Sequence, residues 1–217
     1  MRLKNLAQKY YWGAGVQQNY TKALQLYLQA AEQGDTEAQF IAGGMYYRGM
    51  GTPQDLNRAF SLLYGAAVKG NSTPQSQRIL GQFFLTGQII PQNYAEAMKW
   101  YTLAAENGDS ESQSELAVLY FTGRGGVQDL EKAFFWFEKS ARQGLAVAQY
   151  SLGIMYYTGS GVENVDLIKA YGWFSLAAGQ NHLDGIAARD YLQTVLSSDQ
   201  LLEAQNYALQ IFQEINS

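Results

Sequence analysis

The residue types that most often perform catalysis or bind metals are scarce in this chain. His182 is the single histidine and there is no cysteine, which excludes thiolate nucleophiles, disulfides, zinc–cysteine sites and mechanisms that need two histidines. The spacings S-x-x-K, G-x-S-x-G, H-E-x-x-H, G-x-x-x-x-G-K-[ST] and G-x-G-x-x-G do not occur. Asp and Glu fall mostly where helices begin or on their polar faces. We therefore predict no catalytic residue, no metal site and no cofactor.

One polar run with Gly and Asp has the composition of a ligand-binding loop. It reads AAEQGDTEAQ at residues 30–39 and returns as AAENGDSESQ at residues 104–113. A calcium loop needs acidic oxygens at alternate positions and a closing Glu, which neither copy has. Gly34 instead lies where a helix ends in a left-handed residue, and Thr36 with Gln39 has the spacing of a capping box, which Ser110 and Gln113 repeat. We interpret the run as a turn.

This turn belongs to a repeat that covers the chain. Three columns of small residues share steps of 36 to 38 residues: Gly13, Gly49, Gly87, Gly123 and Gly159; Ala23, Ala59, Ala97, Ala133 and Ala170; and Gly34, Gly70, Gly108 and Gly144. A common period of this length indicates a solenoid. We predict one domain, residues 1–217, with repeats at about 3–35, 36–72, 73–109, 110–145 and 146–181, followed by two capping helices at about 183–216.

Within each repeat the apolar spacing is helical. Residues 36–48 and 55–70 both place apolar side chains at i, i+4 and i+7, which predicts two antiparallel helices joined by a Gly-containing loop. Small residues such as Gly43 let neighbouring helices approach closely. The second helix of a repeat has an Asn or Asp at its predicted start, as expected of an N-cap: Asn19, Asp55, Asn93 and Asp129.

Some positions depart from the repeat. The run Gly144–Gln149 has no capping side chain and Ile89 replaces the second loop glycine, so we expect these junctions to be looser or locally rearranged. His182 is expected to face solvent or to cap a helix, and the single RGG at residues 124–126 to be a repeat loop. Ser197 or Ser198 can cap the last helix, whose exposed side should be the more polar because it closes the stack.

The aligned repeats read A-Q-x-x-L-G-x-x-Y-x-x-G-x-G, then D-x-x-K-A-x-x-W-(F/Y)-x-x-A-A-x-x-G, and the best instance begins at Ala148. This pattern resembles the Sel1-like repeat family, relatives of the tetratricopeptide repeats, over essentially the whole chain. The resemblance implies an all-α, right-handed α/α superhelical solenoid of five helix pairs with a C-terminal two-helix cap. It also implies a non-enzymatic, bacterial adaptor or scaffold for protein–protein interaction. Departures from the family pattern include Ala42 for Leu, Leu26 and Leu62 for Trp, and Ile89.

In this family and in tetratricopeptide folds the first helix of each repeat lines a concave groove, so its variable columns are candidate binding positions. Aromatic and Arg side chains are favoured as anchors because they bury much area at small rotamer cost. Arg48 and Arg78 are candidates to bind a partner's carboxylate or C-terminus. The alternative for the tyrosines is that they pack between repeats. The predicted partner-binding residues are Tyr11, Tyr47, Phe121, Tyr157, Phe40, Arg78, Tyr150 and Arg48.

Composition limits partners and compartment. The chain has 217 residues, 47% of them hydrophobic, and a net charge of −4 without a Lys/Arg block, which disfavours nucleic acid and anionic membranes. No apolar run has the length of a membrane span. The start, MRLKNLAQKYYWG, has no apolar core of a signal peptide, and we expect a soluble protein of the bacterial cytoplasm or periplasm. The same segment begins inside a repeat, as expected of a longer array or of an open end able to pair.

The leading hypothesis is an adaptor, not an enzyme, that binds a peptide or protein segment on its concave face. One alternative is a hydrolase of cell-wall or lactam substrates, which needs a deep pocket with convergent groups of perturbed pKa. The other is a structural module that assembles with itself, for which a weak homo-oligomer would be evidence.

Overall fold

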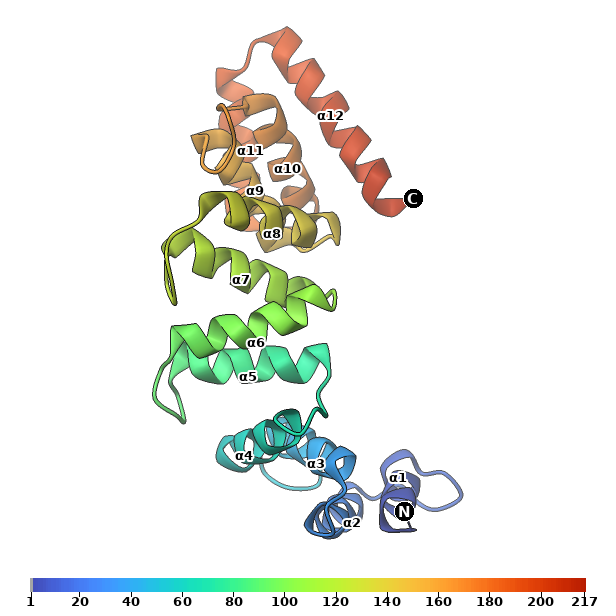
Figure 1. Cartoon of the computed structure of the whole chain (residues 1–217). Coiled ribbons are helices and arrows are strands. Elements are labelled where there is room, and N and C mark those ends of the chain that lie inside the picture. Colours follow the sequence, from blue (N-terminus) through green and yellow to red (C-terminus); the bar gives the residue numbers. More distant parts are fainter. Residues whose placement is uncertain (1) are drawn as a thin grey trace. The chain divides into compact units, whose positions relative to one another are not determined.

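The computed structural model describes residues 2–217, and the regular secondary structure of this range consists of helices joined by loops (Figure 1). It divides into two compact units, residues 1–100 and residues 101–217, with the division inside α6. The helices are α1 (Arg2–Trp12), α2 (Tyr20–Glu32), α3 (Thr36–Arg48), α4 (Leu56–Ala67), α5 (Pro74–Thr86), α6 (Tyr94–Glu106), α7 (Ser110–Thr122), α8 (Leu130–Arg142), α9 (Ala146–Thr158), α10 (Leu167–Gly179), α11 (Leu183–Val195) and α12 (Ser198–Asn216). We call the odd-numbered helices A helices and the even-numbered ones, up to α10, B helices.

The turns between repeats are confirmed as turns. Gly34, Gly70, Gly108 and Gly144 have φ between +83° and +90°, the left-handed region in which a side chain is strained. The B helices begin as predicted: the side-chain oxygens of Asn19, Asp55, Asn93 and Asp129 each accept a hydrogen bond from the backbone N–H three residues on, at 2.9 to 3.0 Å. Local sequence thus determines where these B helices begin and where they end.

The predicted capping boxes at Thr36 and Ser110 are wrong. The preceding residue is the N-cap in both helices: Asp35 Oδ1 accepts from Ala38 N at 2.9 Å, and Asp109 Oδ1 accepts from Ser112 N at 2.7 Å.

Gln113, assigned to the second of those boxes, connects repeats instead. Gln113 Nε2 donates to the Ala105 carbonyl at 3.0 Å, and its Oε1 accepts from Gln143 Nε2 at 2.7 Å. Gln149 repeats the pattern, with Oε1 accepting from Gln180 Nε2 at 2.9 Å. These amides are almost fully buried, so such a hydrogen bond removes an otherwise costly buried polar group.

The run Gly144–Gln149 has no side-chain cap, as predicted, but its backbone is not rearranged. Leu145 has φ −70° and ψ 113°, close to the φ −69° and ψ 110° of the capping residue Asp109. Gln180 Nε2 also donates to the Gly144 carbonyl at 2.8 Å, so the next repeat secures this turn in place of a local cap.

The loop with Ile89 does differ from its counterparts. A Cβ added to Gly51 would lie 2.4 Å from Tyr20 C, and one added to Gly161 would lie 2.3 Å from Leu130 O, so these glycines, both with positive φ, are seated against the preceding B helix. Ile89 has no positive φ and packs with Trp100 around Leu80 and Phe83. A bulky residue cannot occupy the glycine position, and the loop therefore takes another path.

Four of the B helices, α2, α4, α8 and α10, carry a Lys or Arg three residues after the N-cap that contacts a tyrosine ring. The cations of Lys22, Arg58, Lys132 and Lys169 lie 4.3 to 5.4 Å from the ring centres of Tyr10, Tyr46, Tyr120 and Tyr156. Arg58, Lys132 and Lys169 also pair with their N-cap aspartates. Burial raises the pKa of Tyr156 far above its ordinary value, as expected of a phenol that fills the space between helices.

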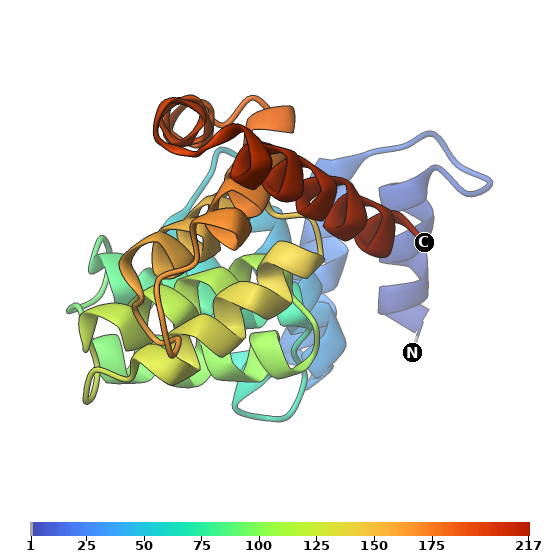
Figure 2. The same cartoon turned by 90° about the horizontal axis from the view of Figure 1, so that it is seen from above.

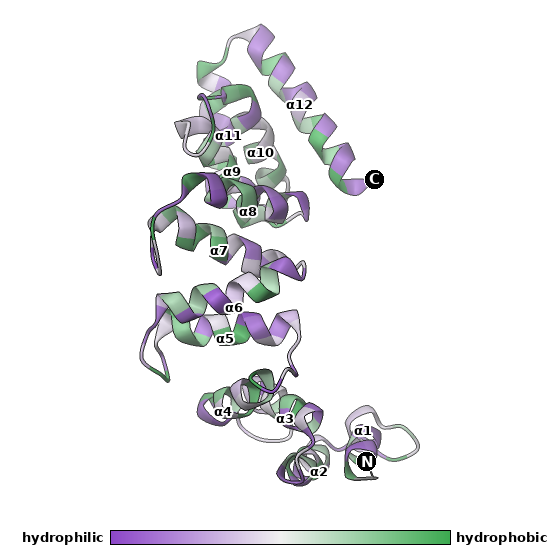
Figure 3. Ribbon diagram, in the orientation of Figure 1, coloured by the Kyte–Doolittle hydropathy of each residue, from purple (hydrophilic) through white to green (hydrophobic). Residues whose placement is uncertain are grey.

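Unit 2 ends in α11 and α12, both of which pack on α10 (Figure 2). His182 caps α11, since its Nδ1 accepts from Gly185 N at 3.2 Å, and Ser197 caps α12. The exposed side of α12 is the more polar one, as expected, but three apolar side chains are exposed among the polar ones. Leu202, Leu209 and Phe212 are 56 to 60% exposed, and hydrophobic residues recur along α12 in Figure 3.

Candidate functional site

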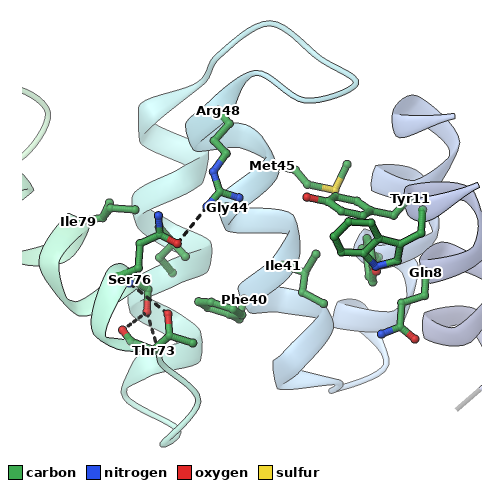
Figure 4. A pocket seen from close by; sticks show the side chains of 14 residues that line it. Gln8, Tyr11, Phe40, Ile41, Gly44, Met45, Arg48, Thr73, Ser76 and Ile79 are labelled. Atoms are coloured by element: carbon green, nitrogen blue, oxygen red, sulfur yellow. Dashed lines mark hydrogen bonds between the residues drawn. The ribbon is translucent and has the colours of Figure 1, made fainter. Parts of the chain in front are cut away.

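The A helices of unit 1 enclose a groove that we call groove 1 (Figure 4). Its volume is about 360 Å³ and side chains of α1, α3 and α5 supply most of its walls. It is lined by Gln8, Tyr11, Trp12, Tyr27, Phe40, Ile41, Gly44, Met45, Arg48, Leu63, Thr73, Gln75, Ser76 and Ile79.

The apolar end of groove 1 is rigid and accessible. Tyr11 lies edge-to-face against Trp12 at 4.8 Å and against Tyr27 at 6.5 Å, and its hydroxyl donates to Met50 Sδ at 3.7 Å. Trp12 is nevertheless 71% exposed, an unusual position for the largest apolar side chain. A held aromatic wall with an exposed indole can bury apolar ligand surface at little cost in side-chain entropy.

The opposite end is polar. Arg48, at the end of α3, donates from Nη2 to Gln75 Oε1 at 3.1 Å, and both side chains are exposed. Nearby, Thr73 and Ser76 bond to each other in a capping box that begins α5. Arg48 is the one charged residue among those that line groove 1. The groove therefore combines apolar rings with a single cation.

The A helices of unit 2 form a second surface, groove 2, from two adjoining hollows of about 340 and 200 Å³ that share Ile154. It is lined by Val118, Phe121, Phe137, Tyr150, Ser151, Ile154, Met155, Tyr157, Phe174, Ala188, Tyr191 and Leu192. None of these side chains is charged at neutral pH, so groove 2 offers apolar area and phenolic hydroxyls only.

Two tyrosine contacts organise groove 2. A hydrogen bond with Tyr191 raises the pKa of Tyr157, which places two exposed phenols side by side on α9 and α11. Tyr150 is held between Phe174, at 5.7 Å, and His182, which stacks on it at 4.9 Å. His182 is thus committed to a cap and a ring contact, and it supports the groove wall.

Six of the eight predicted binding residues line these grooves. Tyr11, Phe40 and Arg48 line groove 1, and Phe121, Tyr150 and Tyr157 line groove 2. Tyr47 lines neither; it is half-buried, with its ring 6.1 Å from Phe83, which is the packing role considered as the alternative. Arg78 is half-buried on α5 and lines neither groove.

Sequence reasoning missed one column of the grooves. This column lies four residues after the position of Phe40 in each of the six A helices. Five of its six residues line a groove, and Gln82 of α5 does not. The column reads Gln8, Gly44, Gln82, Val118, Ile154 and Tyr191, with steps of 36, 38, 36, 36 and 37 residues. The common period of these residues could have identified the column from sequence, but their side chains differ so much in chemistry that the column did not stand out.

Other kinds of site have little support in the part of the chain that the structure describes. Residues 2–217 contain no group of three or more His, Cys, Asp or Glu side chains able to hold a metal ion. No helix within the same range has the length and apolar character needed to cross a membrane.

Comparisons with known proteins agree with the helical repeats of this fold. The Sel1 repeat profile matches five times, at residues 4–35, 36–71, 74–109, 110–145 and 146–182. A Sel1 repeat protein from Oxalobacter formigenes is 30% identical with a TM-score of 0.70, over 82% of this chain and 72% of that one. A protective antigen of uropathogenic Escherichia coli with an SLR fold is 29% identical with a TM-score of 0.62 over 97% of this chain.

The chain covers 52% of that antigen, and so spans about half its length. No curated protein matches the chain. The five profile matches and the solved structures establish an all-α superhelical repeat fold. The chain belongs to the Sel1 repeat family.

Proposed function

We propose that this protein is a non-enzymatic adaptor that binds a peptide or a segment of a protein on the concave face formed by its A helices. Sel1 repeats are generally protein-interaction modules, and the bacterial relatives make a bacterial protein plausible. The observation that carries the proposal is the gathering of exposed and half-buried aromatic residues from several A helices in grooves 1 and 2.

The size and lining of the grooves suit a short segment. A cavity of about 360 Å³ is large enough for a few side chains and falls in the range of small-ligand pockets. Rigid Tyr, Trp and Phe anchors supply most of the binding free energy in many interfaces. Because the grooves are shallow and distributed over several helices, a weak or transient interaction is expected.

A hydrolase remains the less favoured hypothesis because the grooves offer few groups for proton transfer. No Asp, Glu, Lys or His lines groove 1 or groove 2. Self-association is the second candidate, and one observation favours it: Leu202, Leu209 and Phe212 form an exposed apolar stripe on α12. Sizing by light scattering distinguishes it from a monomeric adaptor.

Gly44 offers a direct test of groove 1. A Cβ at Gly44 would meet only Arg48 Nη1, at 3.9 Å, so Gly44→Leu should fill the groove without disturbing the core. Ser61→Leu adds the same side chain at an exposed position of α4 outside the groove and is the matched control. Val118→Arg introduces a charge into uncharged groove 2, at a position that is 39% exposed.

The assay is selection of random peptides of about twelve residues on the wild-type protein, followed by fluorescence-polarisation titration of the enriched peptides. We expect Gly44→Leu or Val118→Arg to weaken binding at least about tenfold, while Ser61→Leu binds like wild type. Enriched peptides that bind all three variants equally would exclude the A-helix grooves as the site. Failure to enrich any peptide would argue against segment recognition.

A further inference from the structure

We propose that groove 1 selects a segment in which a large apolar side chain is followed or preceded, about three residues away, by an Asp or Glu side chain. This inference rests on the proposed function and specifies the partner of groove 1. Groove 2, which has no charged lining residue, is not expected to share the requirement for an acid.

The requirement for an apolar side chain follows from the half of groove 1 between α1 and α3. Tyr11 from α1 faces Ile41 and Met45 from α3 (Figure 4), and Trp12 from α1 also lines the groove. These side chains provide no charged partner, and Tyr11 has its hydroxyl engaged by Met50. Water in this half is therefore displaced most favourably by an aromatic or long aliphatic side chain.

The requirement for an acid follows from the half between α3 and α5. Arg48 is the single charged group of the lining, and no carboxylate among the lining residues competes for it. Arg48 Nη2 donates to the neutral amide oxygen of Gln75, at 3.1 Å. A carboxylate makes a stronger, charge-assisted and bidentate contact with a guanidinium than an amide does, and so an acidic ligand can replace Gln75 with a gain.

The spacing follows from the helices. The two halves lie on either side of α3, so their centres are separated by roughly one helix-to-helix distance, about 8–10 Å. An extended chain covers that distance in about three residues. We assign the acid to a side chain and not to a chain end, because Arg48 and Gln75 are both exposed and a segment can continue past them.

The experiment uses peptides selected on the full chain and then screened for loss of binding to Gly44→Leu, which isolates ligands of groove 1. The strongest such peptide is synthesised with its acid, with that acid changed to Gln, and in forms with a free and an amidated C-terminus. Each form is titrated against wild type, Arg48→Gln and Arg48→Glu. Gln75→Ala, at the exposed neighbour of Arg48, is the control for loss of the internal hydrogen bond.

We expect enrichment of Asp or Glu two to four residues, that is about three, from a Trp, Phe or Leu. Arg48→Gln should weaken binding of the acidic peptide about tenfold and leave the Gln peptide nearly unchanged. Arg48→Glu should bind a peptide with Lys at the acid position better than the acidic one. Gln75→Ala should bind the acidic peptide at least as well as wild type does.

Groove-1 peptides without an acid, or equal effects of Arg48→Gln on acidic and Gln peptides, would overturn the inference while leaving the proposed function intact. Binding that is lost on amidation of the C-terminus would also overturn it, because the carboxylate would then be terminal. If no selected peptide loses affinity for Gly44→Leu, both the inference and the use of groove 1 fail.

Discussion

Two adjacent glycines of α3 provide a sharp prediction, because the same substitution should have opposite effects. A Cβ on Gly43 would lie 2.9 Å from Leu63 Cγ, 3.0 Å from Leu63 N and 3.1 Å from Leu62 Cβ. Leu63 is 1% exposed and one of the close atoms is backbone, so the neighbour cannot move away cheaply. A Cβ on Gly44 meets only the flexible end of Arg48, at 3.9 Å.

The magnitudes follow from two opposing terms. Replacing Gly by Ala inside a helix stabilises by about 1 kcal/mol through backbone entropy. Overpacking a close contact costs about 1–3 kcal/mol, and the backbone contact at Gly43 favours the upper part of that range. We expect Gly44→Ala to stabilise by about 0.5–1 kcal/mol and Gly43→Ala to destabilise by about 1–2 kcal/mol.

Thermal unfolding followed by circular dichroism measures the difference. One kcal/mol corresponds to about 2–4 °C for a chain of this size, so the two variants should differ in Tm by roughly 3–12 °C, with wild type between them. Equal Tm values, or a Gly43→Ala protein more stable than wild type, would refute the close packing of α3 on α4. The reversed order would mean that the face of α3 has been assigned wrongly.

Two other predictions concern the C-terminal helices. His182→Ala should destabilise α11 by about 1 kcal/mol because the cap on Gly185 N is lost. His182→Asn, which supplies an amide oxygen as the capping acceptor, should recover most of that loss. Hydrogen exchange of the first turn of α11 measures both effects, and equal exchange in His182→Ala and wild type would exclude the cap. The hydrogen bond from Gln210 and the contact with Arg142 lower the pKa of Glu214. A lowered folded-state pKa adds stability that is complete above the unfolded value of 4.5 and is lost as the pH falls through the folded value. Attachment of α12 through Arg142 should therefore weaken below about pH 4.5, which limited proteolysis with an acid protease can measure. Glu214→Gln should remove that acid-dependent step. An identical acid response in this variant would assign the step to other carboxyls.

Short-range features of the molecule were predictable from sequence because they depend on the backbone of a few consecutive residues. The 36–38-residue columns predicted repeated helix pairs, and the N-caps Asn19, Asp55, Asn93 and Asp129 were confirmed. The choice of Asp35 over Thr36 as a cap was missed, since both residues can cap and only the geometry of the turn distinguishes them. The family was also accessible, because its motif recurs in every repeat.

Tertiary structure decided the properties that depend on neighbours from other helices. The sequence indicated Gly43 as a residue of close helix packing, but only the structure shows that Gly43 packs against Leu63 and that Gly44 opens a groove. Tyr47, unlike Tyr11 and Tyr157, lines no groove, and its ring packs against Phe83 from the next repeat. The periodic pattern determines which residues repeat, but the side chains of adjacent helices determine which of them remain accessible to a partner.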